Sequence, residues 1–218
     1  MSCRRLVVPV EEWAVSLEKR EDGSSQKIVG RAAVFYDPST PGTEYQLFSD
    51  LKERIMPRAF NKALNDRHDV RALFNHDPNM VLGRTASGTL KLTKSLRGLD
   101  YVIDPPETSY ANDLKVSLAR GDVTGSSFGF RVLEQKFRTE TNADGVPMDI
   151  REIHSVELLD VSPVTHPAYT ATESGLRSMG DVSEARAARD AWKAEEEKAR
   201  TGRLFSMAAR THRAESLE

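Results

Sequence analysis

The sequence predicts a mainly β domain, a closed antiparallel β-barrel decorated by short helices, followed by a charged tail. Short apolar segments recur between residues 13 and 161 and are separated by turns rich in Gly, Pro, Asn and Asp. Two segments within this range have helical spacing instead. Beyond about residue 175, Ala, Glu, Lys and Arg dominate. We therefore expect one domain over residues 1–175 and a charged helical or disordered tail over residues 176–218.

Alternating apolar and polar side chains indicate the strands of the first half of the chain. Residues 13–36 alternate on either side of a turn at Asp22–Ser25, which is typical of a β-hairpin. Further short strands are expected at residues 70–74, 80–84, 89–92 and 99–103.

Two short helices are expected between these strands. Pro57 suits the first turn of a helix in which Phe60 and Leu64 share one face. Thr108 is a suitable N-cap for a second helix, and Gly121 is a suitable stop at its C-terminal end.

A long hairpin is expected near the end of the domain. Strands over residues 127–137 and 150–161 are joined by a polar turn centred near residue 143. In an antiparallel hairpin the residue numbers of paired positions add up to a nearly constant value. With a turn centred near residue 143, the partner of Ser127 is therefore expected near residue 159. Cross-strand neighbours lie about 5 Å apart, which makes this pairing a candidate site.

Charge and cysteine content argue against several classes of protein. The 218 residues carry 31 basic and 33 acidic side chains, a net charge of −2, so neither nucleic-acid nor membrane binding is expected. Cys3 is the single cysteine, and the five histidines lack the His-Glu-x-x-His spacing, so no metal site is expected. Without a long apolar run or a signal peptide pattern, a cytoplasmic location is the default expectation.

Two polar residues stand where a plain core does not require them. His76 follows an apolar strand, and the simpler interpretation of it is a surface-loop histidine. Ser127 lies within the small-residue stretch Gly125–Gly129, where a tight bend into a strand is the simpler interpretation. The functional interpretation is a nucleophilic hydroxyl beside backbone N–H groups that face a developing oxyanion.

Two acidic residues interrupt the apolar stretch 156–161. Strand alternation places Asp160 on the same face as Leu158 and turns Glu157 outward. The predicted hairpin register brings Asp160, or Glu157 after a small slip, next to Ser127. A histidine from another strand would then complete a nucleophile, base and orienting acid.

The chain resembles the tailed-phage prohead (capsid maturation) serine protease family, which is related to the herpesvirus assemblins. The resemblance covers about residues 12–172. It rests on six short stretches that occur in the family's order, at residues 30–35, 53–60, 73–77, 81–84, 126–130 and 158–169.

This resemblance implies a serine endopeptidase on an assemblin-like barrel, without a cofactor. His76 and Ser127 match the catalytic histidine and serine by position. Assemblins use a second histidine as the third member, whereas the phage enzymes use an acid, so Asp160 is preferred and Glu157 is the reserve. The oxyanion or substrate contacts are assigned to Gly129, Gly125 and the turn at Arg84, with no choice among them.

The resemblance also implies partners and a location. The substrates would be the phage major capsid protein or scaffold protein, and the enzyme itself, inside the immature capsid in the host cytoplasm. The tail would be removed by self-cleavage, and self-association is expected by analogy. The alternative is a catalytically inactive capsid-assembly or scaffold-binding protein on the same fold.

Overall fold

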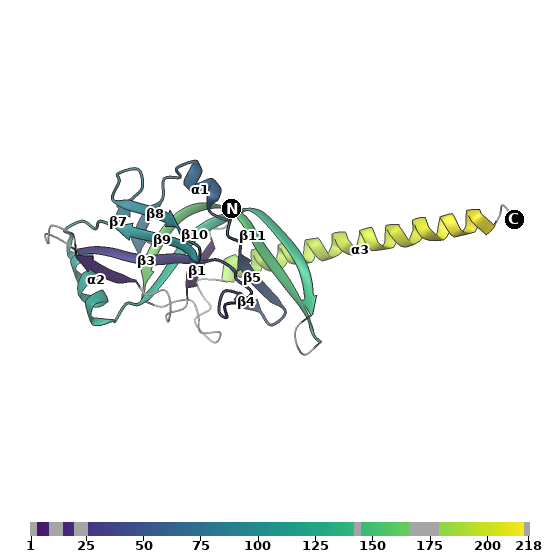
Figure 1. The fold of residues 1–218 in the computed structure, drawn as a ribbon, viewed down its shortest axis with the longest axis horizontal. Coiled ribbons are helices and arrows are strands. Elements are labelled where there is room, and N and C mark those ends of the chain that lie inside the picture. The colour runs from purple at the N-terminus through teal and green to yellow at the C-terminus, as the bar shows by residue number, and fades with distance from the viewer. Residues whose placement is uncertain (1–3, 9–14, 20–25, 142–144, 166–178, 216–218) are drawn as a thin grey trace. The chain divides into compact units, whose positions relative to one another are not determined.

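The computed structural model describes residues 4–8, 15–19, 26–141, 145–165 and 179–215 (Figure 1). The chain divides into two compact units, Met1–Asp181 and Val182–Glu218. Strands predominate over helices among the described residues, so the prediction of a mainly β protein is confirmed.

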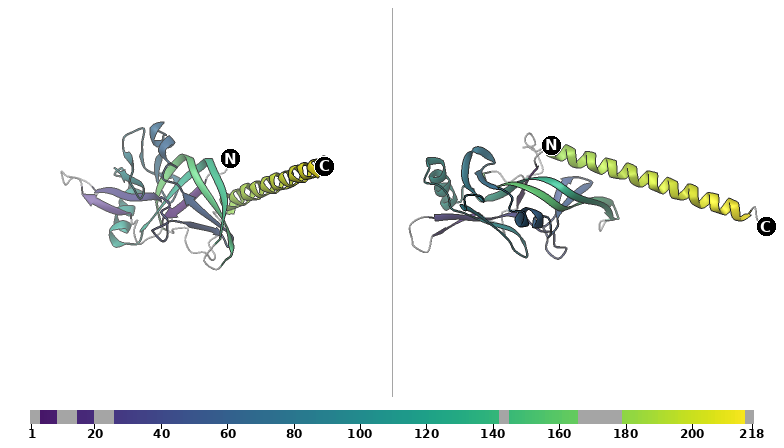
Figure 2. Two further views of the ribbon diagram at one scale, coloured as in Figure 1. Left: turned by 45° about the vertical axis from the view of Figure 1, so that its right-hand side comes forward. Right: turned by 90° about the horizontal axis from the view of Figure 1, so that it is seen from above.

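A seven-stranded sheet carries most of the candidate residues. Its main path is β1-β10-β11-β5-β4, and β6 joins both β11 and β7. Figure 2 shows β10 and β11 side by side over their length. The strands are β1 (Arg4–Val8), β4 (Tyr45–Phe48), β5 (Leu51–Ile55), β6 (Arg71–Phe74), β7 (Asp77–Arg84), β10 (Gly125–Thr141) and β11 (Pro147–Val164).

A second sheet of four strands has the order β2-β3-β9-β8. Antiparallel pairing of β2 with β3 confirms the first predicted hairpin, although its turn at Asp22–Ser25 lies outside the described residues. The strands are β2 (Ser16–Lys19), β3 (Gln26–Val34), β8 (Leu90–Lys94) and β9 (Gly98–Ile103).

The expected closed barrel is not seen. Within the described ranges, no ladder joins the two sheets, which pack through side chains instead. The hydroxyl of Ser126 on β10 donates to the Tyr101 oxygen on β9, at 2.9 Å. A barrel requires backbone pairing around the whole ring, whereas two sheets with apolar inner faces enclose a core without it. The alternation pattern specifies an inner face but not which strands meet.

Both expected short helices are present, but the first begins later than predicted. α1 (Asn61–Asn65) follows a turn that begins at Pro57, so Pro57 is not in its first turn and Phe60 is its N-cap residue. α2 (Ser109–Arg120) has Thr108 as its extended N-cap residue and Gly121 as its C-cap, with a φ of 79° in the left-handed region. The hydroxyl of Thr108 makes no capping hydrogen bond, so backbone geometry rather than side-chain capping starts this helix.

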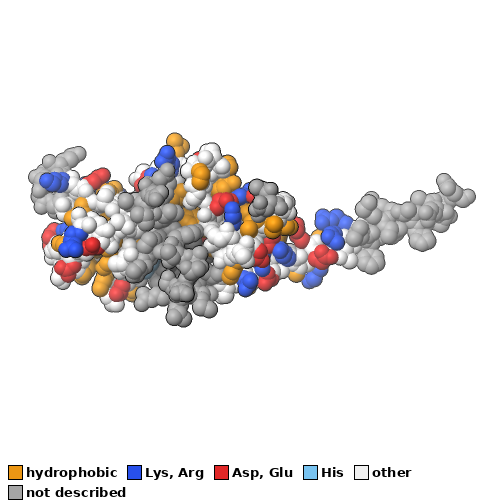
Figure 3. Space-filling model, turned by 90° about the horizontal axis from the view of Figure 1, so that it is seen from below, with side chains coloured by type: hydrophobic (Ala, Val, Ile, Leu, Met, Phe, Trp, Pro, Cys, Tyr) orange, Lys and Arg blue, Asp and Glu red, His pale blue; other side chains and the backbone are white. Residues whose placement is uncertain are grey.

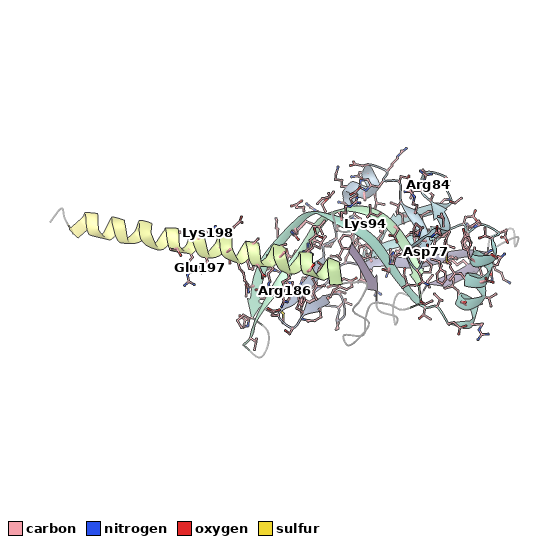
Figure 4. The ribbon with its side chains drawn as sticks, turned by 180° about the vertical axis from the view of Figure 1, so that it is seen from behind. Asp77, Arg84, Lys94, Arg186, Glu197 and Lys198 are labelled. Carbon is pink, nitrogen blue, oxygen red and sulfur yellow. The ribbon has the colours of Figure 1, made fainter. Side chains whose placement is uncertain are left out.

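The second unit consists largely of a long helix, α3 (Met179–Glu215). Figure 4 labels three of its exposed charged side chains, Arg186, Glu197 and Lys198. Ala, Glu, Lys and Arg favour a helix without an apolar face. No helix in the described part of the chain has the length and apolar character needed to cross a bilayer.

Aromatic rings fill the space between the sheets. Phe128 stacks on Phe130 with 4.9 Å between ring centroids and meets Phe60 edge-on at 5.5 Å. Phe60 in turn contacts Phe35, which follows β3. These offset and edge-on contacts are the favoured arrangements of aromatic pairs. The ring cluster thus joins the strand that carries Ser127 to the rest of the core.

Ion pairs attach β5 to the outer part of the β10–β11 hairpin. The buried ion pair between Glu53 of β5 and Arg151 of β11 has a length of 3.1 Å. Arg54 makes two hydrogen bonds of 2.7 Å to Glu140, and these bonds lower the pKa of that carboxyl. Charged side chains of both signs are interspersed on the described surface visible in Figure 3. Neither β4 nor β5 is predicted from alternation, because charged residues occupy buried positions in β5.

A glycine on β3 makes room for the tyrosine that contacts β10. A Cβ atom added to Gly30 would lie 2.5 Å from the Tyr101 hydroxyl oxygen and 2.7 Å from its ring. Tyr101 is buried, and this burial raises the pKa of its phenol. A side chain at position 30 therefore has to displace a tyrosine that is bonded to Ser126.

We expect Gly30→Ala to lower the free energy of unfolding by about 1–3 kcal/mol, because the added methyl overpacks the core at Tyr101. Chemical denaturation followed by far-ultraviolet circular dichroism measures this loss. Gly202→Ala is the matched control, since nothing lies within 4 Å of an added Cβ there. Equal stability of the Gly30→Ala variant and the wild type would contradict the packing argument.

Candidate active site

Ser127 lies on an interior strand of the seven-stranded sheet. On one side it is paired with Ser162 of β11, and on the other with Val7 of β1. Ser126 and Phe128 point into the core on the opposite face. The hydroxyl of Ser127 therefore faces away from the core, and the residue is nevertheless 0% exposed.

The observed register differs from the predicted one by three residues at this position. The hairpin pairs Ser127 with Ser162 and Gly129 with Asp160, rather than Ser127 with residue 159. Asp160 is thus a diagonal neighbour of Ser127. Diagonal positions across a ladder lie about 7–8 Å apart, which leaves room for an imidazole ring between the two side chains.

An irregularity in β11 lies directly before Asp160 and separates the direction of Leu158 from that of Asp160. Gly129 pairs with Asp160, but the next residue, Phe130, pairs with Leu158, so Leu159 is an extra residue on β11. Leu158 and Val161 both belong to the hydrophobic core. The predicted common face for Leu158 and Asp160 is therefore wrong, because the bulge between them interrupts strict alternation and turns Leu158 to the core. Asp160 lies two residues from Ser162 in a regular part of the ladder and so shares the face of Ser162 and Ser127.

His76 is presented by a two-residue turn between β6 and β7. Phe74 pairs with Asp77 across this turn, and the two residues between them have φ values of 54° (Asn75) and 57° (His76). Positive φ at both central positions is the sign pattern of a type I′ turn, which Asn tolerates and most other residues avoid. Strain of this kind is typical of residues that are held in place for function.

Asn75 fastens this turn to the end of β11. Its backbone N–H donates to the carbonyl of Pro163 at 3.0 Å. Its side-chain Oδ1 accepts the backbone N–H of Thr165 at 2.9 Å and the Thr165 hydroxyl at 3.3 Å. Since β6 also runs parallel to β11 at Asp160, the turn is attached at two places to the strand that carries the acid.

The imidazole of His76 lies between Ser127 and Asp160. Its Nε2 is 2.7 Å from Ser127 Oγ, and its Nδ1 is 2.5 Å from Asp160 Oδ1. His76 is 9% exposed and Asp160 is 6% exposed. A carboxylate only accepts hydrogen bonds, so Nδ1 carries the proton and the lone pair of Nε2 faces the serine hydroxyl. This is the nucleophile, base and orienting acid of acyl-transfer enzymes.

Comparison with family models decides the affiliation. The model described as "Caudovirus prohead serine protease" matches residues 14–191, which is most of the chain. The chain belongs to this family. No curated protein and no solved structure matches it with significance. The resemblance seen in the sequence is thereby confirmed, and membership implies a serine peptidase of capsid maturation.

The remaining candidates for a prohead protease site lie outside the cluster. Glu157 pairs with Arg131 at 2.9 Å, and both side chains are partly exposed. Gly129 and Gly125 lie on β10, opposite Asp160 and Val164.

Arg84 ends β7, whereas Asp77, next to His76, begins it; Figure 4 labels both residues. The Arg84 side chain binds Asp69, which raises the pKa of the guanidinium, and its backbone N–H donates to Thr89 Oγ1 at 3.0 Å. The geometry thus brings together His76, Ser127 and Asp160, but not Glu157 or the Arg84 side chain.

Sequence reasoning missed the residues that hold the cluster of His76, Ser127 and Asp160 in place. Asn75 has a detectable signal, because an Asn at the first position of a two-residue turn between strands indicates positive φ. The extra residue Leu159 has no detectable signal, since a bulge leaves the apolar pattern nearly unchanged. Ser162 has no signal of its own either.

We expect Asn75→Ala to be the least stable of three proteins. Alanine loses both contacts to Thr165 and is strained at positive φ, whereas Asn75→Gly loses the contacts without the strain. The free energy of unfolding of the glycine variant should therefore be about 1 kcal/mol higher than that of the alanine variant and lower than that of the wild type. Urea denaturation measures all three. An alanine variant as stable as the glycine variant would show that the turn is not strained.

Proposed function

We propose that this prohead protease is a serine endopeptidase that cleaves scaffold protein, or the scaffolding segment of the capsid protein, and itself. Cleavage would occur within the immature capsid in the host cytoplasm. The catalytic residues in this proposal are Ser127, His76 and Asp160. The observation that carries it is the pair of contacts from one imidazole, 2.7 Å to the serine hydroxyl and 2.5 Å to the carboxylate.

The proposed mechanism follows from these contacts. His76 Nε2 accepts the proton of Ser127 as Oγ attacks the scissile carbonyl, and it then donates that proton to the leaving amine. Water repeats the sequence on the acyl-enzyme, with His76 again as the base. Asp160 accepts a hydrogen bond from Nδ1–H throughout, so it fixes the tautomer and stabilises the imidazolium.

The oxyanion requires backbone donors close to Ser127. Gly129 and Gly125 remain the proposed donors because they flank the serine on the same strand. Gly129 pairs with both β1 and β11, so its N–H would have to leave the ladder to serve in this role. The backbone N–H of Arg84 is a poorer candidate, since it already donates to Thr89 Oγ1.

The charged C-terminal segment has a proposed role in the same reaction. Residues 176–218 would act as a tail that the enzyme removes from itself, leaving a protease domain of residues 1–175. The exposed charged side chains of α3 support this proposal, because a solvated segment is accessible to a second copy of the enzyme.

We expect Ser127→Ala to abolish cleavage, because loss of the hydroxyl of a triad reduces kcat by about a million-fold. The variant is co-expressed with the capsid or scaffold protein, and cleavage is followed on a gel. Mass spectrometry of the purified enzyme tests self-cleavage, since a truncated product should be found with the wild type and not with the variant.

Ser126→Ala is the matched control. This hydroxyl points to the opposite face, toward Tyr101, so its loss should cost about 1 kcal/mol of stability and leave cleavage intact. Cleavage by Ser127→Ala at the wild-type rate would refute the assignment of the nucleophile. A stable wild-type protein that cleaves neither partner nor itself would favour the inactive assembly protein.

A further inference from the structure

Ser162 lies directly against the acid and base of the cluster and has no part in the proposed mechanism. It is opposite Ser127 in the ladder and two residues after Asp160 on β11. It is 0% exposed. Its Oγ is 2.8 Å from Asp160 Oδ1 and 3.3 Å from His76 Nδ1. Both of these partners belong to the cluster, which points to a role in it rather than in the surrounding fold.

The direction of these hydrogen bonds follows from the chemistry of the groups. The carboxylate accepts only, so the Ser162 hydroxyl donates to Oδ1 of Asp160. The same Oδ1 accepts the Nδ1–H of His76. Nδ1 has only one proton, and it donates the hydrogen bond to Asp160, which is nearer than Ser162 Oγ. The Ser162 hydroxyl therefore acts on His76 through the carboxylate oxygen that they share.

Two donors on one oxygen fix the position of that oxygen. Asp160 is nearly buried, so its charge depends on donors within the protein rather than on water. Without the Ser162 hydroxyl, rotation of the carboxylate would be less restricted and its charge less well stabilised. Both effects weaken its hold on the imidazole, whose orientation determines whether Nε2 can accept the proton of Ser127.

We propose that Ser162 is a positioning residue that holds the Asp160 carboxylate against His76. This inference rests on the proposed function, because it assigns Ser162 a role in the same proton transfer. Ser162 contacts no substrate in this role, so its loss affects kcat and not KM. Loss of one hydrogen bond to a charged group corresponds to a decrease in kcat of about 10- to 100-fold.

The test is a double-mutant cycle in the full-length protein. Ser162→Ala, Asp160→Asn and the double variant are compared for cleavage of the capsid or scaffold partner. Ser162→Ala should lower kcat about 10- to 100-fold in the wild-type background and less than about twofold in the Asp160→Asn background. Loss of an acid leaves residual activity about a hundredfold above that of a serine variant, so the cycle is measurable.

Ser155→Ala is the matched control, because Ser155 lies on the same strand opposite Glu134, outside the cluster. It should leave both kcat and KM unchanged. Proton NMR supplies a readout that needs no substrate, since the low-field resonance of the His76 Nδ1–H should move in Ser162→Ala and not in Ser155→Ala.

The outcomes separate this proposal from the function on which it rests. Three outcomes would overturn the role of Ser162 and leave the proposed serine protease intact. They are an equal loss of kcat in the wild-type and Asp160→Asn backgrounds, a change confined to KM, and an unmoved His76 Nδ1–H resonance. An inactive wild type, or an active Ser127→Ala variant, would overturn the proposed function and this role with it.

Discussion

Backbone pairing between β10 and β11 sets the separation of the Ser127 hydroxyl and the Asp160 carboxylate. In this ladder the two residues are diagonal neighbours, with Ser162 directly opposite the serine. A directly opposite acid would lie about 5 Å from the serine and leave too little room for an aromatic ring between them. The diagonal distance accommodates the imidazole of His76 between Ser127 and Asp160. The position directly opposite the serine is occupied by the short side chain of Ser162.

The third side chain reaches this ladder at a conformational cost. His76 has a positive φ, which is unfavourable for a residue with a Cβ atom. The hydrogen bonds of Asn75 to Pro163 and Thr165 oppose the strain by attaching the turn to β11. Pairing of β6 with β11 adds a second attachment. His76 is therefore fixed to the strand that carries Asp160, and the hairpin fixes that strand to the one that carries Ser127.

Local patterns in the sequence predict the elements of this fold better than their arrangement. The predicted β2–β3 hairpin, the Thr108 and Gly121 boundaries of α2 and the long hairpin are all present. These features depend on alternation, capping residues and turn residues that lie close together in the chain. Closure into a barrel depends on contacts between distant strands, which alternation alone does not specify, and it is not seen.

The same distinction applies to the candidate site. The predicted hairpin brings Ser127 and Asp160 together because both lie on it. The prediction misses the three-residue difference in register and the extra residue Leu159. Asp160 faces the serine because it alternates regularly with Ser162, whereas the bulge turns Leu158 to the core. His76 was placed by family resemblance, since no local pattern indicates which distant turn reaches the hairpin.

The complete enclosure of Ser127 has a consequence for when the proposed chemistry takes place. A peptide carbonyl has to touch Oγ, and no part of this serine is accessible in the structure. A movement that uncovers the serine must therefore precede each first encounter with substrate, and its rate sets an upper limit on turnover. The free energy of that opening therefore restrains the proposed cleavage for as long as the protein keeps this conformation.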